Sequence, residues 1–136
     1  MNRPLVLDVS CSAEFIMGKE GADSLEEYLT DASSIIAPSL YKYEATNLFW
    51  KYHNFHDIPI GQCQSSLRMA LDLPDTYVES DDLYPETFKL SCVSEHVSYD
   101  VFYLVLAQRK NAILATMDEE LRTLAKDQGA DVHERP

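Results

Sequence analysis

Short apolar runs that alternate with longer amphipathic segments constrain the fold of this chain more than any other feature of its sequence. The runs at 4–8 (PLVLD), 34–38 (SIIAP) and 111–116 (NAILAT) have the length of strands and are too short for buried helices. Strands that alternate with helices form a parallel sheet covered by helices on both faces. We therefore expect an α/β fold of three layers, α/β/α, around a short central parallel sheet of four to five strands.

The remaining elements follow from helical spacing and from capping residues. The spacing predicts helices at 23–32, 39–55, 60–73, 81–96, 98–110 and 118–129, one more helix near residue 10, and short strands at 75–80 and 130–134. The expected N-caps are Ser10 or Ser12, Ser39, Asp81 or Asp82, and Ser98.

Four carboxylates stand at the ends or on the inner faces of these elements. Asp8 ends the first strand and Asp118 follows the strand at 111–116, so both lie at the edge of the sheet where ligands bind. Asp100 occupies the first turn of a helix that is otherwise apolar. Glu44 shares a stripe of its helix with Leu40, Tyr43, Asn47 and Leu48 and is expected to face inward.

Each acid taken alone has an ordinary explanation, because first-turn acids favour a helix start and Glu44 has lysines nearby. Together they would repel one another and raise each other's pKa unless cations neutralise them. An all-oxygen cluster of this kind suits Mg²⁺ or Mn²⁺. The four positions therefore indicate a metal-dependent phosphoryl-transfer site.

The charge of the chain bears on its partners. With 23 acidic and 11 basic residues, the formal net charge is −12 at pH 7. A polyanion would need a local basic patch or bound cations to approach such a chain. The basic residues that could form a patch are Arg3, Lys42, Lys51, Arg68, Arg109 and Lys110.

Length and composition favour one domain, residues 1–136, in a reducing compartment. No apolar run is long enough to span a bilayer, and the apolar stretch near the N-terminus is interrupted at Asp8, unlike a secretory signal. Cys11, Cys63 and Cys92 form no CxxC pair and are expected to be mostly buried, reduced thiols. We expect a cytoplasmic protein with no membrane partner.

Three stretches resemble the PIN domain, and most closely the toxin subunits of VapBC-type toxin–antitoxin pairs. They are LVLDVS at 5–10, APSLYKYEATN at 37–47 and SYDVFYLVLAQRKNAILATMDEEL at 98–121. The resemblance implies a PIN-like fold and an endoribonuclease that uses Mg²⁺ or Mn²⁺ to cut RNA. It also implies a cognate antitoxin as partner and a homodimer.

The resemblance assigns roles by position. Asp8 and Asp100 would ligate a first ion directly, and Glu44 and Asp118 would complete the pocket, directly or through water. Ser10 and Thr116 resemble the hydroxyl residues that line the site, and Asn47 resembles the polar residue one helical turn after the glutamate.

Two other functions remain open on the residues alone. A PIN-fold binding module with little or no nuclease turnover would be consistent with the charge of −12. A phosphotransfer domain with Asp8 as nucleophile is weaker, because no lysine follows the strand at 111–116. Ser10 or Cys11 as a catalytic nucleophile lacks a base placed by sequence.

The histidines and aromatic residues have structural explanations. His53 and His56 fit a solvated helix end better than a zinc site, which needs four organised ligands. The aromatic residues of 41–55 fit a core or partner surface better than a base-stacking platform. Trp50 and Tyr52 are expected to be the most exposed of them.

Overall fold

The computed structural model describes residues 2–19 and 22–134. Within these residues the strands β1 (Leu5–Leu7), β2 (Ile35–Pro38), β3 (Thr76–Val78) and β4 (Ile113–Ala115) form one sheet. Every pairing is parallel, and the strand order is β3-β2-β1-β4. The helices are α1 (Val9–Ile16), α2 (Ala22–Asp31), α3 (Leu40–His56), α4 (Ile60–Asp72), α5 (Tyr84–Ser94), α6 (Ser98–Lys110) and α7 (Glu119–Asp127), with a 3-10 turn, η1, at Ser80–Asp82.

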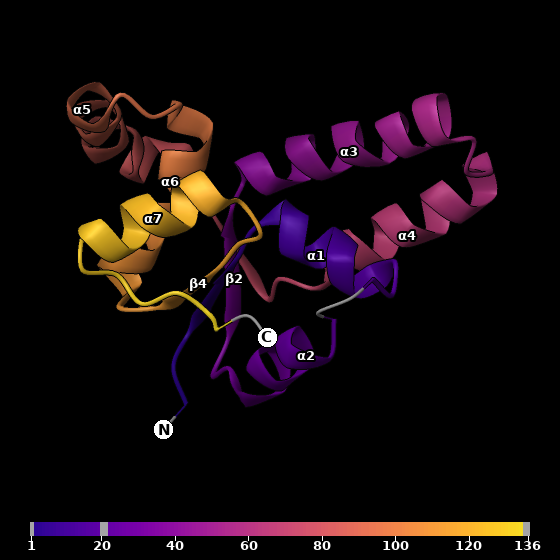
Figure 1. Ribbon diagram of the computed structural model, residues 1–136, viewed down its shortest axis with the longest axis horizontal. Coiled ribbons are helices and arrows are strands. Elements are labelled where there is room, and N and C mark those ends of the chain that lie inside the picture. The colour runs from indigo at the N-terminus through magenta and orange to yellow at the C-terminus, as the bar shows by residue number, and fades with distance from the viewer. Residues whose placement is uncertain (1, 20–21, 135–136) are drawn as a thin grey trace.

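Helices cover both faces of the sheet. On one side α6 packs against β1, β2 and β4, and α5 and α7 pack against α6. On the other side lie α1, α2 and α4, and α3 forms a long hairpin with α4 (Figure 1). The expected α/β fold with a short parallel sheet between helical layers is therefore confirmed.

The burial of α6 explains its composition. Val101 and the run Tyr103–Ala107 are all buried, because the sheet covers one side of α6 and two helices cover other sides. A helix enclosed in this way needs apolar residues nearly all round. The same helix carries Asp100 in its first turn, at the end where the enclosure opens.

The strand order places a topological switch point beside β1. From β1 the chain adds β2 and β3 on one side, and it then returns to add β4 on the other side. Open parallel sheets bind ligands outside the carboxyl ends of their strands at such a reversal. Leu7 pairs with Ala115, so Asp8 and Thr116 leave the sheet next to each other. The fold thus brings the ends of β1 and β4 together at the position where a site is expected.

Several predicted helix caps are wrong. Asp8 is the N-cap of α1, and Ser98 is the first residue of α6 rather than its cap. Ser39 is the N-cap residue of α3, as predicted, but its backbone angles are helical, φ −57° and ψ −25°, and its side chain makes no capping hydrogen bond. Asp81 and Asp82 belong to the turn η1, one step before α5 begins. The strand expected at 130–134 is a single bridge between Leu114 and Val132.

The predicted buried stripe of α3 is also wrong. The buried residues are Tyr41, Ala45 and Phe49, whereas Tyr43 is 75% exposed and Asn47 is exposed. Phe49 packs with residues of α4 in a small separate apolar cluster, so the inner face of α3 is turned toward the hairpin. Glu44 consequently lies at the boundary of the buried face and is only half-buried.

The Tyr41 hydroxyl ties three helices together. It donates to the Ala70 carbonyl oxygen at 2.6 Å and lies 2.7 Å from the Ser12 hydroxyl oxygen. We expect Tyr41→Phe to lower the free energy of unfolding by about 1–2 kcal/mol, since both partners stay buried without it. Urea unfolding measures this change. Tyr43→Phe, on the exposed face of the same helix, is the matched control, and equal effects of both changes would contradict the assignment.

The thiols and the hydropathy of the helices agree in part with expectation. Cys11 and Cys63 are buried, and Cys92 is exposed, with no disulfide among the described residues. No helix in the described part of the chain is long and apolar enough to cross a membrane.

Candidate functional site

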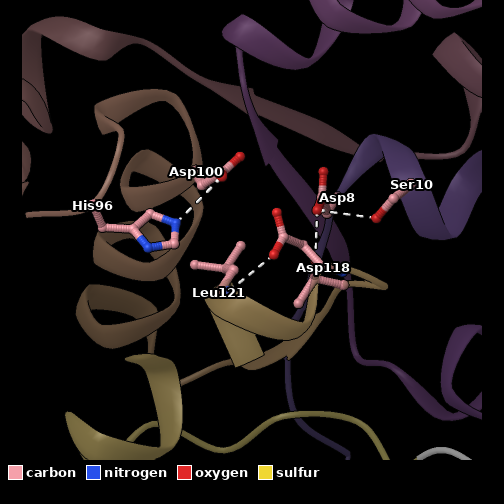
Figure 2. A network of polar contacts seen from close by, with 7 residues as sticks. Asp8, Ser10, His96, Asp100, Asp118 and Leu121 are labelled. Atoms are coloured by element: carbon pink, nitrogen blue, oxygen red, sulfur yellow. Dashed lines mark hydrogen bonds and ion pairs between the residues drawn. The ribbon is translucent and has the colours of Figure 1, made fainter. Parts of the chain in front are cut away.

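A cleft of about 430 Å³ opens at the carboxyl ends of β1 and β4. Asp8 follows β1, Asp118 precedes α7, Glu44 comes from α3 and Asp100 from α6, and all four line this cleft. Figure 2 shows Asp8, Asp100 and Asp118 pointing toward one another from three separate segments. The fold therefore brings together the four acids that the sequence singled out.

Two parallel hydrogen-bond relays hold the Asp8 carboxylate. Thr116 Oγ1 donates to Asp8 Oδ2 at 2.6 Å and accepts the backbone N–H of Asp118 at 3.1 Å. Ser10 Oγ donates to the same oxygen at 3.1 Å and accepts the backbone N–H of Met117 at 3.0 Å. Each hydroxyl is oriented by the loop after β4, so each must point its proton at Asp8. The arrangement fixes the position of the carboxylate and favours its ionised form.

Asp118 and Asp100 are also oriented by neighbours. Asp118 Oδ1 accepts the backbone N–H of Leu121 at 3.1 Å and so caps α7. His96, in the connection between α5 and α6 and four residues before Asp100, has its Nε2 3.3 Å from Asp100 Oδ2 (Figure 2). The ordinary explanation, a first-turn helix acid, is correct for Asp118 as local structure. It does not account for the convergence of Asp118 with the other three acids.

Glu44 is held by a buried tyrosine. The Tyr103 hydroxyl of α6 donates to Glu44 Oε1 at 2.6 Å. The pKa of Glu44 is raised to about 7, because burial, aided by the charges of Asp8 and Asp100, outweighs the lowering effect of the Tyr103 hydrogen bond. A glutamate with this pKa is only partly ionised near neutral pH, and a bound cation would favour its ionised form.

The same pressure acts on the two central aspartates. Burial raises the pKa of Asp8, and the Asp100 charge adds to this, while the hydrogen bonds from Thr116 and Ser10 oppose it. Burial also raises the pKa of Asp100, with a contribution from the Asp118 charge, and His96 partly offsets the rise. Carboxylates that destabilise one another in this way release free energy when a cation binds among them.

The donor set fits a hard divalent cation by its chemistry. The four carboxylates offer only oxygen, and the raised pKa values of Asp8, Glu44 and Asp100 reflect burial together with the charge of neighbouring acids. Across residues 2–19 and 22–134, no three His, Cys, Asp or Glu side chains already meet at ligand distance. The acids face one cleft, and each is held in place by its own hydrogen-bond partner.

The secondary positions expected at the site fall into two groups. Ser10 and Asn47 line the cleft, whereas Thr116 is fully buried behind Asp8 and acts only through its hydrogen bond. Tyr103 and His96 were not expected to contribute. The spacing of His96, four residues before Asp100, is a local signal that could have found it, whereas the contact of Tyr103 with Glu44 joins two helices that are distant in sequence. The remaining side chains that line the cleft include Glu14, Lys51, Tyr52 and Met117.

The histidines of α3 do not line the cleft, and its aromatic residues differ in exposure. His53 and His56 are exposed near the end of α3, as expected. Trp50 is 52% exposed, but Tyr52 is half-buried, since its ring packs against Phe49 and His56. The expectation that Trp50 and Tyr52 are the most exposed aromatic residues of 41–55 is therefore wrong, because Tyr43 and Phe55 are more exposed than either.

A second cavity, of about 240 Å³, lies at the opposite, amino end of β1 and β4. Its residues include Arg3, Glu27 and Asp31, and Arg3 is already paired with Asp131 at 2.7 Å. The four converging acids lie instead at the carboxyl edge, where we place the candidate site.

Comparisons with solved structures give the fold an independent basis. PAE2754 from Pyrobaculum aerophilum is similar at a TM-score of 0.74 and 21% identity, with 97% of this chain and 92% of that chain covered. VapBC2 from Rickettsia felis, bound to a DNA fragment from its promoter, gives 0.67 and 15% over 98% and 99%. FitAcB from Neisseria gonorrhoeae gives 0.54 and 12% over 96% and 96%. No protein-family model and no curated protein matches the sequence at a significant level.

The fold of this chain is therefore the PIN fold, as its sequence resemblance implied. The likeness extends over nearly the full length of each compared chain. At 21% identity or less, this likeness shows the fold alone. The function depends on the side chains that line the cleft.

Proposed function

We propose that this protein is a Mg²⁺- or Mn²⁺-dependent endoribonuclease and the toxin component of a toxin–antitoxin pair. The observation that carries the proposal is the convergence of Asp8, Glu44, Asp100 and Asp118 on one cleft at the switch point of a PIN fold. Burial and neighbouring charges raise the pKa values of Asp8, Glu44 and Asp100, and a cluster of carboxylates in this state is suited to cation binding.

The side chains have separate roles in this proposal. Asp8, fixed by the hydroxyls of Ser10 and Thr116, and Asp100, oriented by His96, would ligate the ion. Glu44 and Asp118 would complete the pocket, directly or through water. Bound there, Mg²⁺ or Mn²⁺ would supply an activated water and offset charge on the phosphoryl group.

Asn47 completes the polar lining on the α3 side. It lies one helical turn after Glu44, is exposed and lines the cleft. Its amide can donate to a phosphate oxygen or to a base without adding negative charge. We therefore assign Asn47 to substrate contact rather than to ion binding.

Exposed apolar side chains support the proposed protein partners, a cognate antitoxin and a second copy of the chain. VapBC2 and FitAcB, which share the fold, are two-component assemblies by name. Exposed apolar patches on soluble proteins commonly mark interfaces. Here they lie on the α3–α4 hairpin and on α5 with the start of α6: Trp50, Phe55, Ile60 and Met69, and Tyr84, Phe88, Val93, Val97 and Tyr99.

A PIN-fold binding module is the second candidate, and the net charge of −12 favours it. The purified chain, incubated with end-labelled single-stranded RNA, separates the two. The nuclease predicts cleavage with Mn²⁺ that stops with EDTA, together with a rise in melting temperature when Mn²⁺ binds. A rise in melting temperature without cleavage would support the binding module. The absence of both cleavage and a rise would contradict the nuclease and the cation site alike.

A further inference from the structure

A substrate with a phosphate backbone has to enter a cleft that holds four acids, so the cations nearby decide its path. Three of the basic side chains are engaged elsewhere. Arg3 pairs with Asp131 and Arg109 with Glu86, each at 2.7 Å. Lys42 Nζ lies 4.4 Å from the centroid of an aromatic ring on β3. None of these three cations lines the cleft.

One lysine does line it. Lys51 of α3 is exposed, and within residues 2–19 and 22–134 no carboxylate lies at ion-pair distance from it. Glu44, Asn47 and Lys51 follow one another at the three- and four-residue spacing of a single helix face. This face leads from acid through amide to cation over about 10 Å, at 1.5 Å per residue.

A second lysine stands beside the same wall. Lys19 Nζ, just after α1, lies 5.4 Å from the centroid of the Tyr52 ring, and Tyr52 lines the cleft. The aromatic ring attracts the ammonium group and keeps it at this end of the cleft. Glu14 of α1 also lines the cleft and makes the wall mixed in charge, but two cations stand against this one acid.

The opposite side of the cleft offers no comparable path. Next to Asp100 and Asp118, a groove of about 490 Å³ lies between α7 and the residues that end α5 and lead to α6. Among the described residues its lining has no lysine or arginine, and its charged side chains other than His96 are Glu95, Glu119, Glu120 and Asp127. A polyanion is repelled on that side and attracted on the α3 side.

We propose that Lys51 and Lys19 bind the phosphate backbone of single-stranded RNA where the strand leaves the carboxylate cleft. The proposal rests on the nuclease function proposed above and names the surface that holds its substrate. Tyr52 is a positioning residue in it, because its ring holds the Lys19 ammonium group. Flexible lysines that contact phosphates contribute affinity without selecting a base sequence.

The test measures binding and cleavage separately. Binding of a fluorescein-labelled RNA dodecamer of mixed sequence is followed by anisotropy in the Asp100→Asn background, at several salt concentrations. Lys51→Ala and Lys19→Ala should each weaken binding about three- to tenfold and lower the slope of log affinity against log salt by about 0.7. In the otherwise unchanged protein, Lys51→Ala should raise KM for cleavage by a similar factor and leave kcat within about twofold.

Two controls separate charge from shape and place. Lys51→Arg should retain binding, and Lys110→Ala, at the far end of α6 from Asp100, should leave binding and cleavage unchanged. If neither Lys51→Ala nor Lys19→Ala changes binding or cleavage, the proposed RNA-binding surface is wrong and the proposed nuclease activity is unaffected. Lysine-dependent binding without cleavage in the unmutated protein would do the reverse. Absence of RNA binding in every variant would overturn the surface.

Discussion

Asp100→Asn is expected to lower Mn²⁺-dependent RNA cleavage by more than about a hundredfold, above the loss typical of residues that only support a metal ligand. The amide keeps the shape of the side chain but removes the negative charge that faces Asp8 and Asp118. The fold should persist, because Asp100 is not in the core and its side-chain hydrogen-bond partners, His96 and Asp118, are themselves only partly buried. Single-turnover cleavage and circular dichroism of the same preparations measure the two effects.

A matched control tests the ordinary explanation of this residue. Asp23 is an exposed first-turn acid of α2, as Asp100 is a first-turn acid of α6, and it does not line the cleft. If Asp100 served only to favour the helix start, Asp23→Asn and Asp100→Asn would leave cleavage equally intact. Retention of cleavage within a few-fold in Asp100→Asn would reject its assignment to the ion.

Glu44→Gln is expected to stabilise the ion-free protein at pH 8. The pKa of Glu44 is raised from 4.5 to about 7 in the folded state, so the folded chain binds this proton more tightly than the unfolded chain. Stability from this group is present below the unfolded pKa and is lost as pH rises through the folded pKa. At pH 8 the ionised carboxylate therefore opposes folding, and its neutral amide analogue does not.

The size of this effect depends on solvent as well as burial. Because Glu44 faces an open cleft, solvent screening reduces the expected gain in the free energy of unfolding to about 1–2 kcal/mol at pH 8 and a few tenths of a kcal/mol at pH 5. His133 complicates the absolute profile, since burial lowers its pKa to about 4 and makes stability rise with pH between about 4 and 6.5. The difference between Glu44→Gln and the unmutated chain removes that contribution.

Denaturant unfolding in EDTA at pH 5 and pH 8 measures the difference. Glu26→Gln, an exposed change on α2, controls for the loss of one negative charge from a chain of net charge −12. Adding Mn²⁺ at pH 8 should reverse the order, because the ion stabilises the chain that binds it more tightly, by about 2.7 kcal/mol at one hundred times its Kd. A variant destabilised in EDTA at pH 8 would show that Glu44 is satisfied without a cation.

The architecture and the positions of two of the acids could be predicted from the sequence by simple geometry. Asp8 and Asp118 follow strands, and the carboxyl ends of parallel strands must share one edge of the sheet. Asp100 stands out because the rest of its helix is apolar. That the whole of 1–136 is one domain stays a prediction.

What the sequence misjudged depends on tertiary contacts. The exposed face of α3 carries Tyr43 and Trp50 and its buried face carries Tyr41 and Phe49, so hydrophobicity alone does not distinguish them. Asp8 occupies the N-cap position of α1, but its side chain makes no capping hydrogen bond. Its Oδ2 accepts hydrogen bonds from the hydroxyls of Ser10 and of Thr116, which follows β4. The bond from Tyr103 to Glu44 spans 59 positions and has no local signature.

The central claim is that Asp8, Glu44, Asp100 and Asp118 form one cation site. Anomalous diffraction from crystals grown with Mn²⁺ tests it most directly, because it locates the ion independently of any activity. If the four acids form a cation site, an anomalous peak is expected in the carboxylate cleft, within about 2.1 Å of oxygens of Asp8 and Asp100. Occupied Mn²⁺ positions elsewhere on the protein, with no peak in this cleft at millimolar Mn²⁺, would contradict it.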